Sequence, residues 1–277
     1  MGLADGRKYF LFRCANCHFS FVENPRTDYE NIYSETYYRG AGIDPLVDYI
    51  YELEFPQKTV RVYEWDGILK TVQTLFPRPL DSKVRWLDYG CGNGGLVRYV
   101  HAATDCEIMG YDEGWVVEKA IEYGIPITRR KEQLESAKYD IVTAIEVLEH
   151  VENPLAALKE IRNFLAPGGL FFFTTGNAQA HRKNLLDWSY FIPEIHISLY
   201  EPDTMKFALE KNRLRSFFPP SPPTGWSDII RFKLLKNMKV RQVNWFEKMI
   251  PWKWITPIID RFMKISAHPI GWCEENN

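Results

Sequence analysis

Apolar residues in the middle of the chain gather in short runs, and longer segments with helical spacing separate these runs. Continuous apolar runs of this length are typical of strands buried on both faces of a sheet. The strands are predicted near residues 84–89, 107–111, 139–145, 170–175, 214–218 and 228–235, and the helices near 95–103, 114–123, 154–165 and 202–211. Strands that alternate with helices predict an α/β fold, in which right-handed crossovers build a parallel sheet covered on both faces.

Segments of different composition flank this alternating body. The first contains an alternating stretch at residues 9–22, several tyrosines and a helix predicted from about Leu46 to Phe76. The last is rich in tryptophan and isoleucine, and Pro251 and Pro257 are expected to break it into short helices. The predicted organisation is a cap at 1–80, a sheet domain at 81–236 and a helical extension at 237–277.

The most informative motif is Asp88-Tyr89-Gly90-Cys91-Gly92-Asn93-Gly94, which joins the first strand of the sheet domain to a helix. Its glycines tolerate positive φ, and without a Cβ their backbone N–H groups can lie directly against a ligand. A phosphate-binding loop would need Gly-Lys-Ser/Thr, and a dinucleotide loop would read G-x-G-x-x-G. The spacing here is D-x-G-x-G-x-G, so neither phosphate-binding pattern fits.

Two acidic residues at strand ends narrow the choice of ligand. Asp88 heads the glycine loop, where a carboxylate would attract a cationic amino group and repel a pyrophosphate. Asp112 ends the next strand, at the position where α/β domains hold ribose hydroxyls. Together the two residues predict a nucleoside that carries an amino acid.

These motifs, together with the segments from Tyr139 to Val151 and from Leu165 to Leu170, resemble the class I S-adenosylmethionine (SAM) methyltransferases over residues 30–235. The resemblance implies a Rossmann-like, doubly wound and mostly parallel sheet of seven strands, with an antiparallel edge strand at 228–235. It implies an enzyme with SAM as cofactor. The implied cofactor-binding residues are Asp88, Gly90, Cys91, Gly92, Gly94, Asp112, Glu113, Trp115, Ile145, Glu146, Tyr37 and Tyr38.

Candidate catalytic residues follow the strand at 139–145. Glu146, Glu149 and His150 stand at i, i+3 and i+4, so one helical turn would place them on one face. Carboxylates and an imidazole suit Mg²⁺ or Mn²⁺, and zinc also accepts imidazole. E-x-x-E-H at this place resembles the ubiquinone-pathway and small-RNA O-methyltransferases, which implies that His196 completes a metal site. A bound metal would lower the pKa of an acceptor hydroxyl.

Two alternatives remain open for these residues. His196 and His150 could act without a metal, as a base or as contacts to the substrate. Glu146 and Glu149 could instead only cap or orient the turn after the strand. The candidate substrate contacts are Asp187, Trp188, Tyr190 and His196, because this fold usually builds its acceptor pocket on the loop that here follows the strand at 170–175.

A second cysteine-containing motif, Cys14-Ala15-Asn16-Cys17-His18, lies in the hairpin predicted at 9–22. C-x-x-C-H is also a haem attachment pattern, but such attachment belongs to exported proteins. The motif resembles half of the zinc ribbon that begins many sugar methyltransferases, which implies zinc at Cys14 and Cys17. A structural zinc ion needs four ligands and the other cysteine pair is absent, so zinc is not favoured.

The composition limits the class of protein. Of the 277 residues, 45% are hydrophobic and 25% are charged, as in ordinary folded domains. No run approaches the roughly 18 apolar residues that span a bilayer, and the chain does not begin like a signal peptide. A cytoplasmic location is therefore expected, and five irregularly spaced cysteines favour thiols over disulfides.

The net charge of −2 hides an asymmetry, because residues 231–264 carry nine basic and two acidic side chains and the rest of the chain sums to −9. A basic and aromatic segment of this kind could be a lid or a dimer face, or it could make a peripheral membrane contact through residues 237–264. Nucleic acid is not an expected partner, and the oligomeric state stays open.

The function predicted from the sequence is transfer of a methyl group from SAM to a hydroxyl of a small-molecule or glycan-linked acceptor. One alternative is metal-independent C- or N-methylation of a nucleotide sugar. Another is a regulatory protein that binds SAM without turnover.

Overall fold

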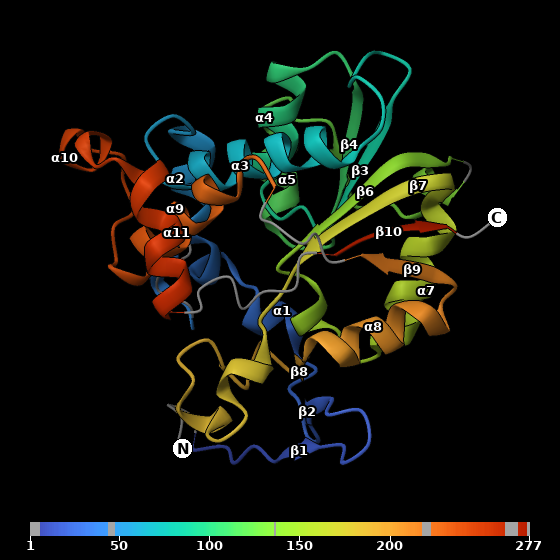
Figure 1. Cartoon of the computed structure of the whole chain (residues 1–277), viewed down its shortest axis with the longest axis vertical. Coiled ribbons are helices and arrows are strands. Elements are labelled where there is room, and N and C mark those ends of the chain that lie inside the picture. The colour runs from blue at the N-terminus through green and yellow to red at the C-terminus, as the bar shows by residue number, and fades with distance from the viewer. Residues whose placement is uncertain (1–5, 44–47, 136, 218–222, 264–270, 276–277) are drawn as a thin grey trace.

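The computed structural model describes residues 6–43, 48–135, 137–217, 223–263 and 271–275, and a twisted sheet of seven strands forms its centre (Figure 1). The strand order is β5 (Ile127–Thr128), β4 (Glu107–Tyr111), β3 (Arg85–Tyr89), β6 (Tyr139–Ile145), β7 (Leu165–Thr174), β10 (Gly271–Glu275) and β9 (Leu214–Phe217). The first five strands run parallel, and β10 pairs antiparallel with both of its neighbours. The prediction of a mostly parallel sheet is confirmed.

Side chains that alternate along the strands supply a hydrophobic core on each face of the sheet. Trp86 and Phe172 belong to one core, whereas their neighbours Leu87 and Phe171 belong to the other. The first core is covered by α3 (Arg61–Leu75), α4 (Gly95–Ala103), α5 (Val116–Glu122) and α9 (Trp226–Asn237), and the second by α7 (Pro154–Phe164) and α8 (Pro202–Lys211). The remaining helices are α1 (Tyr29–Ile32), α2 (Tyr49–Glu54), α6 (Glu132–Glu135), α10 (Trp245–Met249) and α11 (Trp252–Met263).

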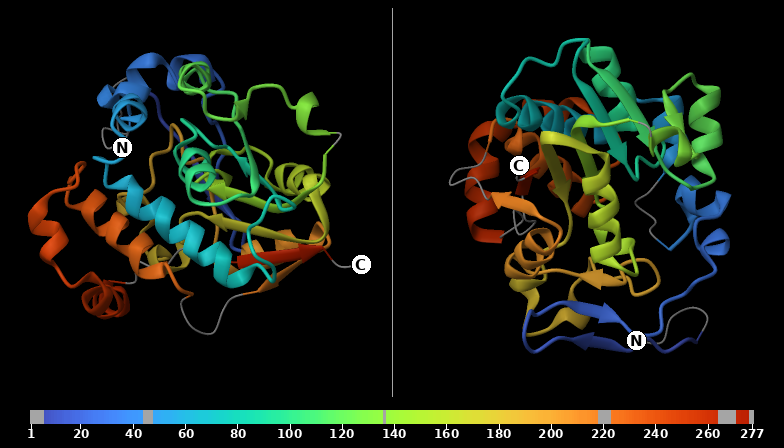
Figure 2. Two further views of the ribbon diagram at one scale, coloured as in Figure 1. Left: turned by 90° about the horizontal axis from the view of Figure 1, so that it is seen from above. Right: turned by 90° about the vertical axis from the view of Figure 1, so that its right-hand side faces the viewer.

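The N-terminal segment forms the predicted hairpin, in which β1 (Leu11–Arg13) pairs antiparallel with β2 (Ser20–Val22). β2 also pairs with β8 (Ser198–Leu199), so the hairpin becomes part of a second, three-stranded sheet. The right-hand view of Figure 2 shows the hairpin at the bottom, below the main sheet. The hairpin therefore braces the segment that directly follows His196.

The prediction of a strand at 228–235 is wrong, because these residues lie in helix α9. Trp226, Ile229 and Ile230 pack in the main core, whereas Phe232 and Leu235 pack in a separate small cluster. From Ile230 to Leu234 apolar and charged residues alternate, which is the spacing typical of a half-buried strand and not of a helix. The antiparallel strand is instead β10, which comes from the segment assigned to the extension and lies between β7 and β9.

Two smaller expectations about helices also differ from the structure. The single helix predicted to reach Phe76 is divided into α2 and α3, with Pro56 in the intervening turn, and Leu46 lies outside the described residues. Pro251 does separate α10 from α11, but α11 continues through Pro257. No helix within the described ranges combines the length and the apolar character needed to cross a bilayer.

The contact between α3 and α9 gives a test of the fold. An ideal Cβ on Gly67 would lie 2.7 Å from the carbonyl oxygen of Gly225 and 2.8 Å from a side-chain carbon of Ile229. We expect Gly67→Ala to lower the free energy of unfolding by about 1–3 kcal/mol through overpacking, although alanine favours a helix by about 1 kcal/mol. Urea unfolding would measure the change, with Gln73→Ala on the exposed side of α3 as the control. A gain in stability for Gly67→Ala would contradict this close packing.

Candidate functional site

A cavity of about 1360 Å³ opens at the carboxyl ends of β3, β4 and β6. Parallel strands bring residues that are far apart in sequence to this one edge, where α/β proteins bind their ligands. Of the predicted site residues, the cavity is lined by Tyr37, Tyr38, Asp88, Gly90, Cys91, Gly92, Asp112, Glu113, Trp115, Ile145, Glu146, Glu149, His150, Trp188, Tyr190 and His196. Gly94 and Asp187 do not line it.

Asp88 lies at the end of β3 with only 3% of its surface exposed. Its carboxylate accepts a hydrogen bond of 2.6 Å from the hydroxyl of Thr143 on the neighbouring strand β6. Burial raises the pKa of Asp88 to about 7, and the nearby Asp112 carboxylate contributes in the same direction. A cationic group in the cavity would favour the ionised form of Asp88.

Asp112 follows β4 and fixes the glycine loop from the other side. Its carboxylate accepts hydrogen bonds from the backbone N–H groups of Gly92 at 3.0 Å and Gly114 at 2.7 Å. Gly92 has a φ of 55°, which glycine adopts without the penalty of a Cβ. Burial raises the pKa of Asp112, and the two amide hydrogen bonds oppose that shift.

An aromatic wall faces the glycine loop. Tyr38 stacks on Trp115 with ring centroids 6.2 Å apart, and it also contacts Tyr49. Tyr37 meets Tyr38 edge to face at 5.2 Å. Tyr37 and Tyr38 therefore line the cavity, although both are largely buried. Such a wall offers flat apolar surface to a planar group such as a purine.

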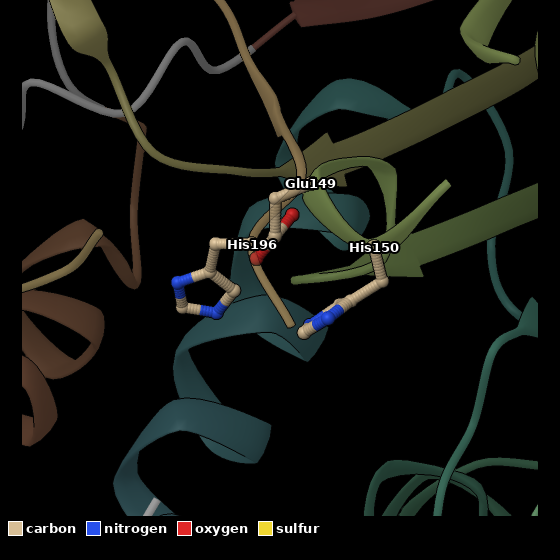
Figure 3. A group of neighbouring side chains, drawn as sticks. All are labelled: Glu149, His150 and His196. Carbon is tan, nitrogen blue, oxygen red and sulfur yellow. The ribbon is translucent and has the colours of Figure 1, made fainter. Parts of the chain in front are cut away.

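Glu149, His150 and His196 converge in the part of the cavity beyond β6 (Figure 3). One potential ligand atom from each residue lies within 4.8 Å of the others. Glu149 and His150 belong to a short turn, Leu148–His150, and His196 precedes β8. The backbone N–H of Ile197 donates to the carbonyl oxygen of Glu149 at 2.8 Å, which joins the two segments directly.

Hydrogen bonds indicate the tautomer of both imidazoles. The Nδ1 atom of His196 contacts the carbonyl oxygen of Tyr190, and Nδ1 of His150 lies 2.9 Å from the carbonyl oxygen of Ile195. A carbonyl oxygen only accepts, so each neutral ring carries its proton on Nδ1 and its lone pair on Nε2. Burial lowers the pKa of His196 to about 3, so this ring is neutral at physiological pH.

Glu149 is fully buried, and its carboxylate accepts a hydrogen bond of 2.7 Å from Thr175. Burial raises the pKa of Glu149 to about 8, with a further contribution from Glu146. A carboxylate and two imidazoles oriented by carbonyl groups are a donor set that suits a divalent cation, because such outer hydrogen bonds hold metal-binding histidines in place.

Glu146 is not one of these three residues, and the expectation of one shared helical face is wrong, although its carboxylate and that of Glu149 both contact the Tyr190 hydroxyl. Its backbone is left-handed, with a φ of 54°, and it precedes the short turn that holds Glu149. Its carboxylate forms an ion pair of 3.2 Å with Lys233 on α9 and lies 3.0 Å from the hydroxyl of Tyr190. Glu146 is thus placed to connect the acceptor loop to α9.

The loop after β7 presents a stack of rings to the cavity. Tyr190 stacks on His196 with centroids 4.3 Å apart and on Trp188 at 4.8 Å. The Tyr190 hydroxyl also donates to the carboxylate of Glu149. Asp187 instead is exposed and accepts a hydrogen bond from Asn184, away from the cavity lining.

The hairpin cysteines lie in the turn between β1 and β2 and do not line the cavity. Hydrogen bonds from the Cys17 and Asn16 backbone lower the pKa of the Cys14 thiol. Among the described residues, the cluster of Glu149, His150 and His196 is the one group of three potential metal ligands that close together. Within the described residues, Cys14 and Cys17 do not belong to a group of three potential metal ligands this close together.

Several residues of the cavity were missed by the sequence analysis. Arg61 and Glu64 lie one helical turn apart on α3, with an ion pair of 3.3 Å between them. In the sequence, the signal that could have identified them is a charged residue at a position that helical spacing turns toward the core. Lys233 was missed because its segment was interpreted as a strand.

Comparison with known proteins identifies the fold and the family. The family model described as a methyltransferase domain matches residues 60–215, which is more than half of the chain. The ubiquinone biosynthesis O-methyltransferase of Photorhabdus laumondii is 30% identical over 155 residues, covering 51% of this chain and 59% of the relative. The protein of that name from Serratia proteamaculans is 33% identical over the same shares of the two chains. This chain thus matches less than two thirds of the length of either relative.

Solved structures support the same fold. An O-methyltransferase family protein from Burkholderia thailandensis superposes with a TM-score of 0.54 at 11% identity, covering 90% of this chain and 63% of that one. The plantazolicin methyltransferase BamL, solved with S-adenosylhomocysteine, superposes with a TM-score of 0.51 at 15% identity, covering 90% and 96%. With the family match and the seven-stranded sheet, these findings show that the chain belongs to the class I SAM-dependent methyltransferases.

Proposed function

We propose that this protein transfers a methyl group from SAM to a hydroxyl oxygen of a small-molecule or glycan-linked acceptor. The observation that carries the proposal is one continuous cavity with two chemically different ends. One end has the glycine loop with Asp88 and Asp112, and the other has Glu149, His150 and His196. The O-methyltransferase relatives support oxygen as the methylated atom.

The first end fits SAM in its chemistry. Asp88 would hold the cationic amino group of the methionine part, and Asp112 would hold the ribose hydroxyls. Trp115 and Tyr38 would cover the adenine. Arg61, Arg129 and Lys233, which line the cavity, each form an ion pair with a carboxylate of the chain.

The second end fits a divalent cation, which Glu149, His150 and His196 would hold. When bound, such an ion lowers the pKa of an acceptor hydroxyl and so makes its oxygen a better nucleophile. The protein's own contribution is orientation, because the carbonyl groups of Tyr190 and Ile195 fix both histidine rings. Trp188 and Tyr190 line this end and would position the acceptor for in-line approach of oxygen to the methyl carbon.

Methyl transfer can be tested with SAM labelled with ¹³C in its methyl group and a fractionated metabolite extract as the source of acceptors. We expect a labelled product whose NMR signal identifies a methyl group bonded to oxygen. A methyl group on carbon or nitrogen would instead favour the nucleotide-sugar alternative. SAM binding without label in any product would favour a regulatory protein.

The pKa of Asp88 predicts how SAM affinity depends on pH. At a pH below the Asp88 pKa of about 7, most of the carboxyl group is protonated, so it must lose a proton before it pairs with the cationic amino group. We expect affinity to rise with pH up to about 7, by at most about tenfold per unit, and Asp88→Asn to bind weakly with a flattened profile. Calorimetric titration from pH 5 to 7 would measure this, with Asp81→Asn outside the cavity lining as the control. An unchanged profile in Asp88→Asn would contradict the assigned pairing.

The metal site can be tested without knowing the acceptor. We expect one Mn²⁺ to bind to the wild-type protein, and Glu149→Gln and His196→Ala to weaken binding at least about tenfold because each removes a ligand. Electron paramagnetic resonance of free Mn²⁺ would measure this binding. Glu132→Gln, at an exposed position of α6, is the matched control.

Equal Mn²⁺ affinity in the wild type and both cavity variants would contradict the metal site. Once an acceptor is known, a chelator should abolish methyl transfer but leave SAM binding unchanged. Full activity in the chelator would favour His196 as a metal-free base.

A further inference from the structure

An unusual set of exposed apolar side chains lies on the segment that follows α9. Met238, Trp245, Phe246, Met249, Trp254 and Ile258 are each between 60% and 77% exposed. Figure 1 shows α10 at the outer edge of the molecule, on the opposite side from α8 and β9. We call these six residues the exposed apolar patch. Single exposed apolar residues are ordinary, but a concentration of this kind marks an interaction surface.

On helix α11 the exposed and the buried side chains lie on different sides of the helix. Thr256 on its inner side is buried and Trp252 packs in the core, whereas Trp254, Pro257 and Ile258 are exposed. The exposed positions are spaced i, i+3 and i+4, so they form one stripe along the helix. A surface helix normally turns a polar face to water. The outer face of α11 is apolar here, and the described part of the chain does not cover it.

The charges around the patch have one sign. In the stretch 238–259, the basic residues Lys239, Arg241, Lys248 and Lys253 are all exposed. The acidic residue of that stretch, Glu247, is only 4% exposed, and its carboxylate contacts Arg231 and Tyr63. The exposed charge of this surface is therefore positive, although the whole chain carries a net charge of −2.

We infer that the surface formed by α10 and α11 binds peripherally to an anionic lipid bilayer. Tryptophan and phenylalanine insert at the boundary between headgroups and acyl chains, and neighbouring lysines attract anionic lipids. A second copy of the chain would present the same positive charges to these four cations, so the charge pattern favours lipid over a symmetric dimer. The aromatic rings and the cations together match the two chemical layers of a membrane surface.

The binding surface adjoins the cavity. Asn237 and Lys239, on either side of Met238 in the patch, both line the cavity. A protein docked through α10 and α11 would therefore hold this edge of the cavity near the bilayer. Vesicle binding itself needs no methyl transfer, so the inference stands or falls separately from the proposed enzymatic function.

Sedimentation of the full chain with vesicles would test the inference. One set of vesicles is pure phosphatidylcholine and the other also contains phosphatidylserine. We expect binding to the anionic vesicles that weakens as salt is raised, and much weaker binding to the neutral ones. The double variant Lys248→Gln and Lys253→Gln should lower the partition coefficient for anionic vesicles about 30-fold, since each cation near the surface contributes about fivefold.

A second double variant tests the contribution of the apolar side chains to vesicle binding. Phe246→Ser with Trp254→Ser should lower partition onto anionic vesicles by about tenfold or more, through loss of inserted apolar surface. Matched controls are Lys206→Gln and Phe207→Ser on α8, which are exposed on the other side of the molecule and should bind like the wild type. Unchanged SAM affinity would show that each variant is folded.

Two results would overturn the inference. One is the absence of salt-sensitive binding of the wild-type chain to anionic vesicles, and the other is equal binding by wild type and both patch variants. Analytical ultracentrifugation identifies the competing occupant. Self-association that Phe246→Ser with Trp254→Ser abolishes, without vesicle binding by the wild type, would assign the patch to a second copy of the chain.

Discussion

The hydrogen bond from the Ile197 amide to the carbonyl oxygen of Glu149 is the contact on which the arrangement of the second half of the cavity depends. It fixes the segment that carries His196 against the turn after β6. The hydroxyl of Tyr200 donates to the carbonyl of Leu148 at 2.7 Å, and the amide of Val22 donates to the carbonyl of Ile197 at 2.9 Å. Through its pairing with β8, the N-terminal hairpin thus helps to hold the segment that carries His196.

Buried carboxylates dominate the electrostatics of both ends of the cavity. Burial raises the pKa of Asp88 to about 7 and that of Glu149 to about 8, so without a ligand each is partly protonated near neutral pH. Removing an unpaired carboxylate from water is costly, and a cation beside it offsets that cost. The two ends therefore favour cationic ligands for the same reason, although one suits an ammonium group and the other a metal ion.

The sequence alone predicted the carboxyl ends of the parallel strands well, because short continuous apolar runs and the glycine loop are strong local signals. Asp88 and Asp112 followed from their places after two such runs, and the structure brings both to the cavity. It predicted α9 wrongly, since apolar and charged residues alternate from Ile230 to Leu234 as in a strand, whereas packing against two clusters makes the segment a helix. The partner of Glu146 was missed for the same reason, because Lys233 lies on that helix.

Glu146 also shows why spacing was a poor guide to the part of the cavity that holds Glu149, His150 and His196. A residue other than glycine with a φ of 54° is strained by about 1–3 kcal/mol, and such strain persists only where neighbouring contacts over-determine it. Here the Glu146 amide donates to the carbonyl of Thr174 on β7 at 2.9 Å, and its carboxylate is held by Lys233. These contacts come from elements distant in sequence, so no local pattern encodes them. The strained conformation turns Glu146 toward α9 and leaves Glu149 to face the histidines.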